Sequence, residues 1–178
     1  MADTLRWVEF KKELLGKLGG FSCGSEAYER ELRDWLFIEA EVAATHGTKV
    51  WLYFNRAGEF VGYSSLSLNQ WKYPDPKSPK IPVAVIPNVA IDQRFFGKPT
   101  GPPEERYSAQ VMEHLIDEAT GLPSQPVVMG LFVHQENKRA IRFYEKCGFT
   151  VFWRTYQDPV TKTVYQAMIR PLRQASPP

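Results

Sequence analysis

The segment from Leu131 to Phe149, LFVHQENKRAIRFYEKCGF, limits the fold of this chain more than any other stretch. Its first residues form a short apolar run typical of a buried strand, and the residues after a turn predict a helix that opens at Asn137. At about 100° of rotation per residue, Asn137, Ile141 and Tyr144 share one stripe of this helix. The neighbouring stripe is apolar and the opposite side is charged, so the two polar residues lie on a border. Such a helix suits one wall of a ligand cleft.

This segment resembles the strand–helix signature of the GNAT family of N-acetyltransferases, with Asn, Ala, Phe-Tyr-Glu-Lys and Gly-Phe at the spacing of that signature. In that family an Asn early in the helix contacts the arm of coenzyme A, and a Tyr further along it gives a proton to the departing thiolate. The resemblance therefore implies that Asn137 and Ala140 bind the coenzyme, and that Tyr144 contacts it and acts as the catalytic acid. Taken alone, the pattern also fits a plain strand–helix unit whose Tyr is a border aromatic.

The length and composition favour one soluble domain. A chain of 178 residues with 43% hydrophobic residues supports a single core, so we expect one domain over residues 1–173 and a flexible tail at 174–178. No apolar run is long enough for a membrane helix, and the charged N-terminus does not read as a signal peptide. Cys23 and Cys147 form neither a disulfide framework nor a metal motif, so a cytoplasmic protein without a metal is expected.

The order of predicted elements resembles the GNAT fold over nearly the whole chain. The predicted strands cover residues 5–10, 49–54, 60–68, 83–91, 127–133, 151–156 and 164–169, and the predicted helices cover 11–18, 25–44, 107–120 and the segment from 137. The implied fold is α/β (α+β), with a mixed central sheet of about seven strands, splayed between its two central strands and flanked by about four helices. A proline- and lysine-rich stretch from residue 71 is expected to begin as a loop.

The second part of the implied coenzyme site is a loop that departs from the family pattern. Most members hold the pyrophosphate with an Arg/Gln-x-x-Gly-x-Gly/Ala loop that leads directly into a helix, where backbone N–H groups bind the anion. Here Arg94, Gly97 and Lys98 match the start, but residues 99–106 (PTGPPEER) precede the helix to which Ser108 belongs. The prolines of this insertion remove N–H donors, and its glutamates would repel phosphate if they faced it.

Two arrangements would preserve binding at this loop. The insertion could bulge away and leave the amides near Gly97, Lys98 and residues 107–109 pointing inward, or Arg94, Lys98 and Arg106 could replace backbone donors with charge. If neither holds, the chain is a catalytically silent acetyltransferase-like protein that binds coenzyme A or a partner. We expect a functional loop, because the signature helix would otherwise have little reason to carry both of its polar residues.

The resemblance implies direct transfer, in which an amine attacks the thioester carbonyl of acetyl-CoA, the co-substrate, and a thiolate leaves. The matching central strand holds Asn88, Val89, Ala90 and Ile91, whose main chain is expected to contact the coenzyme, with Val89 and Ala90 as the first candidates. Tyr144, with an ordinary pKa near ~10, is protonated at neutral pH and can donate to a thiolate whose conjugate acid has a pKa near ~8.5.

The acceptor amine and the general base are less constrained. Asp92 is a carboxylate beside the catalytic strands, but its place at a strand end is also typical of a turn former. A side-chain amine with a pKa near ~10.4 would need a strong base, whereas an α-amine near ~8 is roughly one-tenth free at pH 7. The sequence therefore favours an α-amine. Trp71 and Tyr73 are candidates for the rim of the acceptor site, and His114 is expected on the polar face of its helix.

Further segments resemble the acetyltransferases of toxin–antitoxin pairs, which acetylate the amine of aminoacyl-tRNA. These segments are FSCGSEAYERELRDWLFIEA, GEFVGYSSLSL and the proline-rich lead into IPNVAID. A small molecule, a peptide and aminoacyl-tRNA therefore stay open as acceptors, and a homodimer stays open too. The net charge of +2 does not by itself indicate a nucleic-acid binder. A tRNA acceptor would need a basic stripe, for which the candidates are Lys98, Arg106, Lys138, Arg142 and Arg154.

Overall fold

The computed structural model describes residues 3–72, 75, 77–100 and 106–172, with the side chains of residues 153 and 154 left out. Its strands are β1 (Arg6–Glu9), β2 (Lys49–Phe54), β3 (Phe60–Lys72), β4 (Lys80–Ile86), β5 (Val89–Ile91), β6 (Val128–His134), β7 (Thr150–Gln157) and β8 (Val164–Pro171). Its α-helices are α1 (Ala27–Ile38), α2 (Ala40–Thr45), α3 (Tyr107–Thr120) and α4 (Lys138–Lys146), and its 3₁₀ helices are η1 (Lys12–Lys17) and η2 (Gln93–Phe95).

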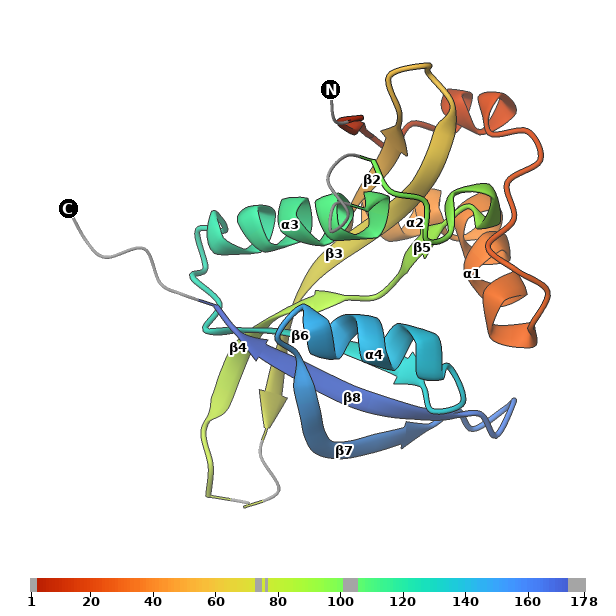
Figure 1. Ribbon diagram of the computed structural model, residues 1–178. Helices are drawn as coiled ribbons and strands as arrows, with labels where there is room; N and C mark the ends of the chain where they lie inside the picture. Colours follow the sequence, from red (N-terminus) through yellow and green to blue (C-terminus); the bar gives the residue numbers. More distant parts are fainter. Residues whose placement is uncertain (1–2, 73–74, 76, 101–105, 173–178) are drawn as a thin grey trace. The chain divides into compact units, whose positions relative to one another are not determined.

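These elements form two compact units, and Figure 1 traces the chain through them. The first unit comprises Met1–Leu66 and Asn88–Leu115, and the second comprises Ser67–Pro87 and Ile116–Pro178. Strand β3 and helix α3 each contribute residues to both units. The expectation of one domain over residues 1–173 stays a prediction, and the expected tail at 174–178 lies outside the described residues.

The sheet of the first unit is antiparallel throughout. β1 pairs with β2, β2 pairs with β3, and β5 pairs with the first half of β3. Every residue of β2 after Lys49 is buried, as its apolar sequence KVWLYF requires. β2 and β3 form a hairpin, and Gly58 supplies the positive φ of 78° that its turn needs. The core of this unit contains Leu18, Phe21, Cys23, Leu36, Ala40, Leu52, Phe54, Phe60, Tyr63 and Ala90.

The sheet of the second unit is mixed. The second half of β3 pairs antiparallel with β4, β4 pairs parallel with β6, and β8 pairs antiparallel with β6 and β7. The parallel ladder ends where Ile86 faces Leu131, although β6 continues to His134 in register with β8. One side of β6 therefore loses its neighbour over its last residues, which is the splay that was expected between the central strands. The mixed α/β sheet fold is confirmed.

Three boundaries differ from the sequence prediction. The strand expected over residues 83–91 is divided after Ile86 into β4 and β5. The helix expected over residues 25–44 is divided at Glu39 into α1 and α2, and Glu26 rather than Ser25 caps it. Glu26 and Glu29 form a capping box in which each side chain accepts a hydrogen bond from the backbone of the other. Trp71, expected in a loop, is a buried residue of β3. Among the described residues, no helix has both the length and the apolar character needed to cross a membrane.

Candidate active site

Helix α4 is fixed at both ends by residues of the sequence signature. At its start, Asn137 Oδ1 accepts the Ala140 backbone N–H at 3.0 Å, as an N-cap does. At its end, Gly148 has a φ of 84°, and the Gly148 and Phe149 N–H groups each donate at 3.0 Å to carbonyls in the last turn. This pair of bonds is a Schellman motif, which needs glycine at the left-handed position. The helix therefore holds Tyr144 on a rigid support.

Tyr144 is a buried residue with only 8% of its surface exposed. Its ring lies 5.5 Å from the Phe143 ring and 5.8 Å from the Phe149 ring, measured between centroids. Its hydroxyl has no hydrogen-bond partner in the described part of the chain, and burial raises its pKa well above the ordinary value. A phenol in this setting stays protonated around neutral pH and has its O–H available to donate.

The cap limits what Asn137 and Ala140 can offer to a ligand. Because the cap uses Asn137 Oδ1 and the Ala140 N–H, the remaining polar group of this pair is the Asn137 side-chain NH₂. Its donors have no partner among the described residues, and the side chain is only half-buried. Asn137 can therefore cap the helix and donate to an acceptor outside it at the same time, whereas Ala140 contributes shape.

The candidate strand β5 lies in the first unit with one edge against β3. Asn88 is tied to Ser65 on both sides, because its carbonyl accepts the Ser65 N–H at 2.8 Å and its N–H donates to Ser65 Oγ at 3.0 Å. In an antiparallel ladder alternate residues bond to the partner strand, so Ala90 turns its peptide groups toward β3 while Val89 and Ile91 turn theirs to the other edge. Val89 and Ile91 are therefore the better main-chain candidates.

Arg94, expected to bind pyrophosphate, already holds a carboxylate. Its Nε donates to Asp92 Oδ1 at 3.0 Å and its Nη2 donates to Asp92 Oδ2 at 3.0 Å, and the Asp92 side chain is buried. Asp92 also accepts the Arg94 N–H at 2.9 Å and so caps η2, which supports its role as a turn former. The hydrogen bond to Asp92 raises the pKa of the guanidinium, and about half of the Arg94 side chain stays exposed.

The insertion before α3 is closed at its base. Pro99 and Arg106 form a β-bridge, so the chain leaves and returns at nearly the same place and α3 starts immediately afterwards. The Lys98 N–H donates to Phe95 O at 3.3 Å. Because Pro99 has no N–H, the bridge turns the Tyr107 N–H toward the Lys98 carbonyl, and the N–H groups of Gly97 and Ser108 stay without an acceptor within the described residues. Which of the two arrangements the insertion adopts stays a prediction. The remaining prolines and the glutamates of the insertion lie outside the described residues.

Sequence reasoning missed a buried polar chain in the first unit. Tyr53 Oη lies 2.7 Å from Ser64 Oγ and 2.7 Å from His114 Nδ1. His114 was expected on a polar face, but it is buried and packs its ring 4.2 Å from the Trp7 ring. Tyr53 and His114 lie far apart in the sequence, so no local pattern indicated their contact. Trp71 packs against Phe132 and Phe152 rather than at a rim, and Tyr73 lies outside the described residues.

The candidate residues fall into two groups, one in each unit. The first unit holds the candidates Asn88, Val89, Ala90, Ile91, Arg94, Gly97, Lys98 and Ser108, and the second unit holds Asn137, Ala140 and Tyr144. The basic candidates divide in the same way, with Lys98 and Arg106 in the first unit and Lys138 and Arg142 in the second, all of them exposed. The Arg154 side chain lies outside the described residues. The roles of these residues stay predictions.

Comparison with known proteins gives a family match and several likenesses of fold. The model of the acetyltransferase (GNAT) family matches residues 7–149. AtaT complexed with acetyl-methionyl-tRNAfMet is 18% identical, with 94% of this chain and 94% of that chain covered and a TM-score of 0.65. A mutant AtaT toxin bound to the C-terminus of the antitoxin AtaR and acetyl-CoA is 16% identical, with 96% and 94% covered and a TM-score of 0.65.

A third solved structure is an enzyme that acts on a polyamine. A chimera of the spermidine N-acetyltransferase SpeG from Vibrio cholerae and hSSAT is 15% identical, with 95% of this chain and 96% of that chain covered and a TM-score of 0.67. At these identities the likeness is one of fold. No curated protein matches this chain in sequence.

Proposed function

The chain belongs to the acetyltransferase (GNAT) family, and we propose that it transfers the acetyl group of acetyl-CoA to a primary amine. The observation that carries this proposal is the Tyr144 hydroxyl, an unpaired donor on a side chain that is otherwise buried. In the proposed reaction the amine nitrogen forms a bond to the thioester carbon and the C–S bond breaks. The thiolate then takes the Tyr144 proton, and the amine loses a proton to solvent or to a base.

The residues of the first unit supply the donors that this reaction needs for the coenzyme. The N–H groups of Gly97 and Ser108 suit the diphosphate, because neither has an acceptor within the described residues and Ser108 lies in the first turn of α3. Lys98 and the exposed part of Arg94 add positive charge. The edge of β5 that pairs with no strand in the described part of the chain offers the Val89 and Ile91 peptide groups to the pantetheine arm and the thioester oxygen.

The acceptor belongs to one of two chemical classes, an α-amine or a side-chain amine. Asp92, the carboxylate nearest the catalytic strands, is engaged by Arg94 and is therefore a poor base. An amine with a low pKa needs less help from a base, which favours an α-amine such as that of a peptide or an aminoacyl-tRNA. The resemblance to toxin acetyltransferases favours aminoacyl-tRNA, and so does the fold likeness to AtaT complexed with acetyl-methionyl-tRNAfMet. Such a protein acts in the cytoplasm.

A second candidate function is a silent coenzyme A-binding or interaction protein. The engagement of Arg94 by Asp92 and the proline-rich insertion favour it, because both reduce the donors available to a diphosphate. The two functions make opposite predictions for turnover. Both functions predict a folded chain, so only a measurement of acetyl transfer distinguishes them.

Two measurements test the proposed function. Calorimetry with acetyl-CoA should detect binding, and no binding at millimolar ligand would rule out the transferase. An assay for free thiol should then show release of coenzyme A with at least one class among polyamines, peptides with free N-termini and aminoacyl-tRNA. Binding without thiol release for any class would leave the silent function. For the tRNA class, affinity should fall steeply with salt, because the contact is with phosphates.

A further inference from the structure

The N-terminal segment of the first unit is fastened to the insertion and to α3 by one side chain. Gln110 Oε1 accepts the Leu5 N–H at 2.9 Å, while Gln110 Nε2 donates to Asp3 O at 2.9 Å and to Thr100 Oγ1 at 3.1 Å. The orientation of this amide is fixed by its partners, because a backbone N–H only donates and a carbonyl only accepts. Gln110 therefore satisfies three groups on two other segments of the chain.

Asp3 completes this contact from the other side. Its N–H donates to the Thr100 carbonyl, and its carboxylate accepts the Tyr107 hydroxyl and, at 3.1 Å, the Arg56 N–H. Thr100 and Tyr107 are buried. We call these residues, Asp3, Leu5, Thr100, Tyr107 and Gln110, the N-terminal clasp.

The clasp residues adjoin, along the chain, the amides that the proposed function assigns to the diphosphate. Thr100 directly follows Pro99, which forms the bridge that closes the insertion, and Tyr107 begins α3. Gln110 lies one helical turn after Tyr107, so its bond to Thr100 joins the first turn of α3 to the near arm of the insertion. Together with the Pro99–Arg106 bridge and the bond from the Asp3 N–H to the Thr100 carbonyl, this contact holds the near arm against the helix.

We infer that Gln110 and Thr100 are positioning residues for the diphosphate end of coenzyme A, an inference that rests on the proposed function. They do not touch the ligand. They tie Thr100, the last described residue before the gap in the insertion, to the first turn of α3, and so fix the chain on both sides of the Gly97 and Ser108 amides. An insertion that removes donors by its prolines is tolerated because the clasp fixes its base, and the N-terminal segment becomes part of the coenzyme site.

The test compares two thioesters that differ only beyond the pantetheine arm. Acetyl-CoA carries the diphosphate and the nucleotide, whereas S-acetylpantetheine carries neither. In Gln110→Met, which keeps the side-chain volume but loses the three hydrogen bonds, kcat/KM for acetyl-CoA should fall about tenfold while kcat/KM for S-acetylpantetheine stays unchanged. The loss should lie in KM rather than in kcat. Thr100→Val, which removes only Oγ1, should also lower the ratio of kcat/KM for acetyl-CoA to kcat/KM for S-acetylpantetheine, but by a smaller factor.

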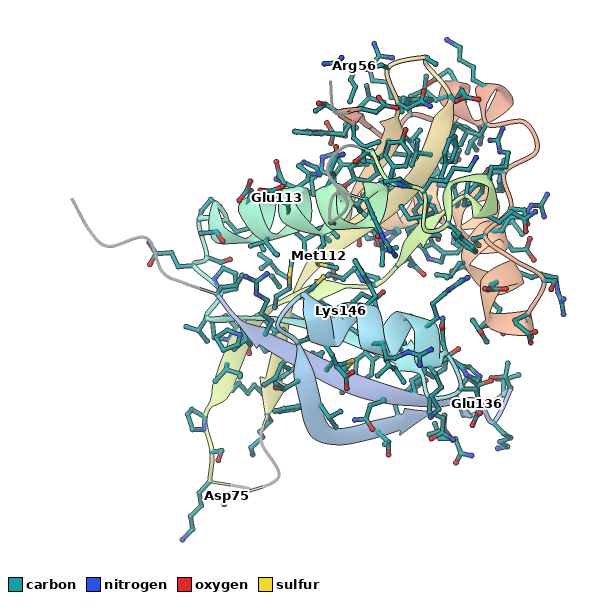
Figure 2. All side chains as sticks on the ribbon, in the orientation of Figure 1. Arg56, Asp75, Met112, Glu113, Glu136 and Lys146 are labelled. Atoms are coloured by element: carbon teal, nitrogen blue, oxygen red, sulfur yellow. The ribbon has the colours of Figure 1, made fainter. Side chains whose placement is uncertain are left out.

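Glu113 provides a matched control on the same helix. It is exposed, and Figure 2 shows it on the side of α3 away from Met112. Glu113→Ala should leave the ratio of the two kcat/KM values at its wild-type level. Equal losses for both thioesters in Gln110→Met and Thr100→Val would mean a general structural defect and would overturn the inference, and so would an unchanged ratio in both.

Failure of the proposed function would give a different pattern. If the wild-type chain turned over neither thioester with any amine, the same comparison would be made by calorimetry with coenzyme A and pantetheine. A selective loss of coenzyme A affinity in both variants would then support the clasp without catalysis. Absence of coenzyme A binding by the wild-type chain would overturn both ideas together.

Discussion

Asn137 and Ala140 are joined by a 3.0 Å hydrogen bond from the Ala140 N–H to Asn137 Oδ1, and this bond divides the two ends of the Asn137 amide between two tasks. The oxygen caps α4, and the NH₂ group stays available to a ligand. A single residue of the signature thus contributes both to folding and to the coenzyme site. The two contributions can be separated, because aspartate also caps helices but has no NH₂.

Two substitutions at Asn137 should separate its effect on protein stability from its effect on coenzyme A binding. Asn137→Ala removes the cap and should lower the free energy of unfolding by about 1 kcal/mol. Asn137→Asp should unfold like the wild type, since its carboxylate still accepts the Ala140 N–H, but its affinity for coenzyme A should fall by about tenfold or more. Chemical denaturation and calorimetry measure the two effects. Wild-type affinity in the Asp variant would contradict a ligand role for the amide.

Tyr144→Phe should lower kcat by about 100- to 10,000-fold, the usual range for the loss of a general acid. Affinity for coenzyme A and the melting temperature should change little, because the hydroxyl makes no hydrogen bond in the described part of the chain. Steady-state thiol release measures kcat. Tyr156→Phe is the matched control, since Tyr156 is 42% exposed on β7. Wild-type turnover in the Tyr144 variant would remove the proposed acid.

The dependence of kcat/KM on pH should reveal the acceptor class. A catalytic acid acts only while it is protonated. Because burial raises the pKa of Tyr144, the fall in kcat/KM caused by its deprotonation should lie above the ordinary tyrosine pKa of about 10. The increase in kcat/KM with pH below that point then reports deprotonation of the acceptor amine. A plateau above about pH 8 indicates an α-amine, whereas a rise that continues toward about pH 10 indicates a lysine-like amine. A decline below pH 9 would contradict the assignment of Tyr144.

Local patterns predicted the framework of this fold because periodicity and turn chemistry act over short distances. The helix Tyr107–Thr120 has the predicted bounds, and Asn137 opens α4 as the sequence indicated. The division at Glu39 was not predictable in this way, since no glycine or proline marks it. The lysine-rich stretch after residue 71 was read as a loop, but the apolar face of Trp71 extends β3 by packing against Phe132.

The candidate site was predictable only where its residues are neighbours in sequence. The spacing of Asn137 and Tyr144 indicated a polar stripe, but the hydrogen bond by which Asn137 Oδ1 caps α4 is visible only in the three-dimensional structure. Arg94 matched a binding motif, yet its contact with Asp92 changes what it can offer. The bond between Leu5 and Gln110 joins residues 105 positions apart, and no single-sequence pattern carries such a contact.

Gly62→Ala should disturb β5 from across the sheet. A Cβ atom on Gly62 would lie 2.2 Å from the Ala90 carbonyl oxygen, which is backbone and cannot move aside cheaply. We expect the free energy of unfolding to fall by about 1–3 kcal/mol, with a parallel loss of coenzyme A affinity. Gly16→Ala is the matched control, because nothing lies within 4 Å of its Cβ position. Equal stability of the two variants would mean that β3 and β5 separate without cost.

Tyr107 should make the protein sensitive to alkaline pH. Burial, together with the hydrogen bond to Asp3, raises the pKa of Tyr107 to about 12, whereas a tyrosine in the unfolded chain ionises near about 10. Between these values the folded chain holds a proton that the unfolded chain has lost, so the contribution is complete below about pH 10 and disappears as pH rises toward about 12. Tyr107→Phe lacks this contribution. Denaturant unfolding at several pH values should therefore show the difference between wild type and variant shrinking across that window. A constant difference would place the Tyr107 phenol outside the clasp, and Tyr156→Phe controls for the loss of a hydroxyl alone.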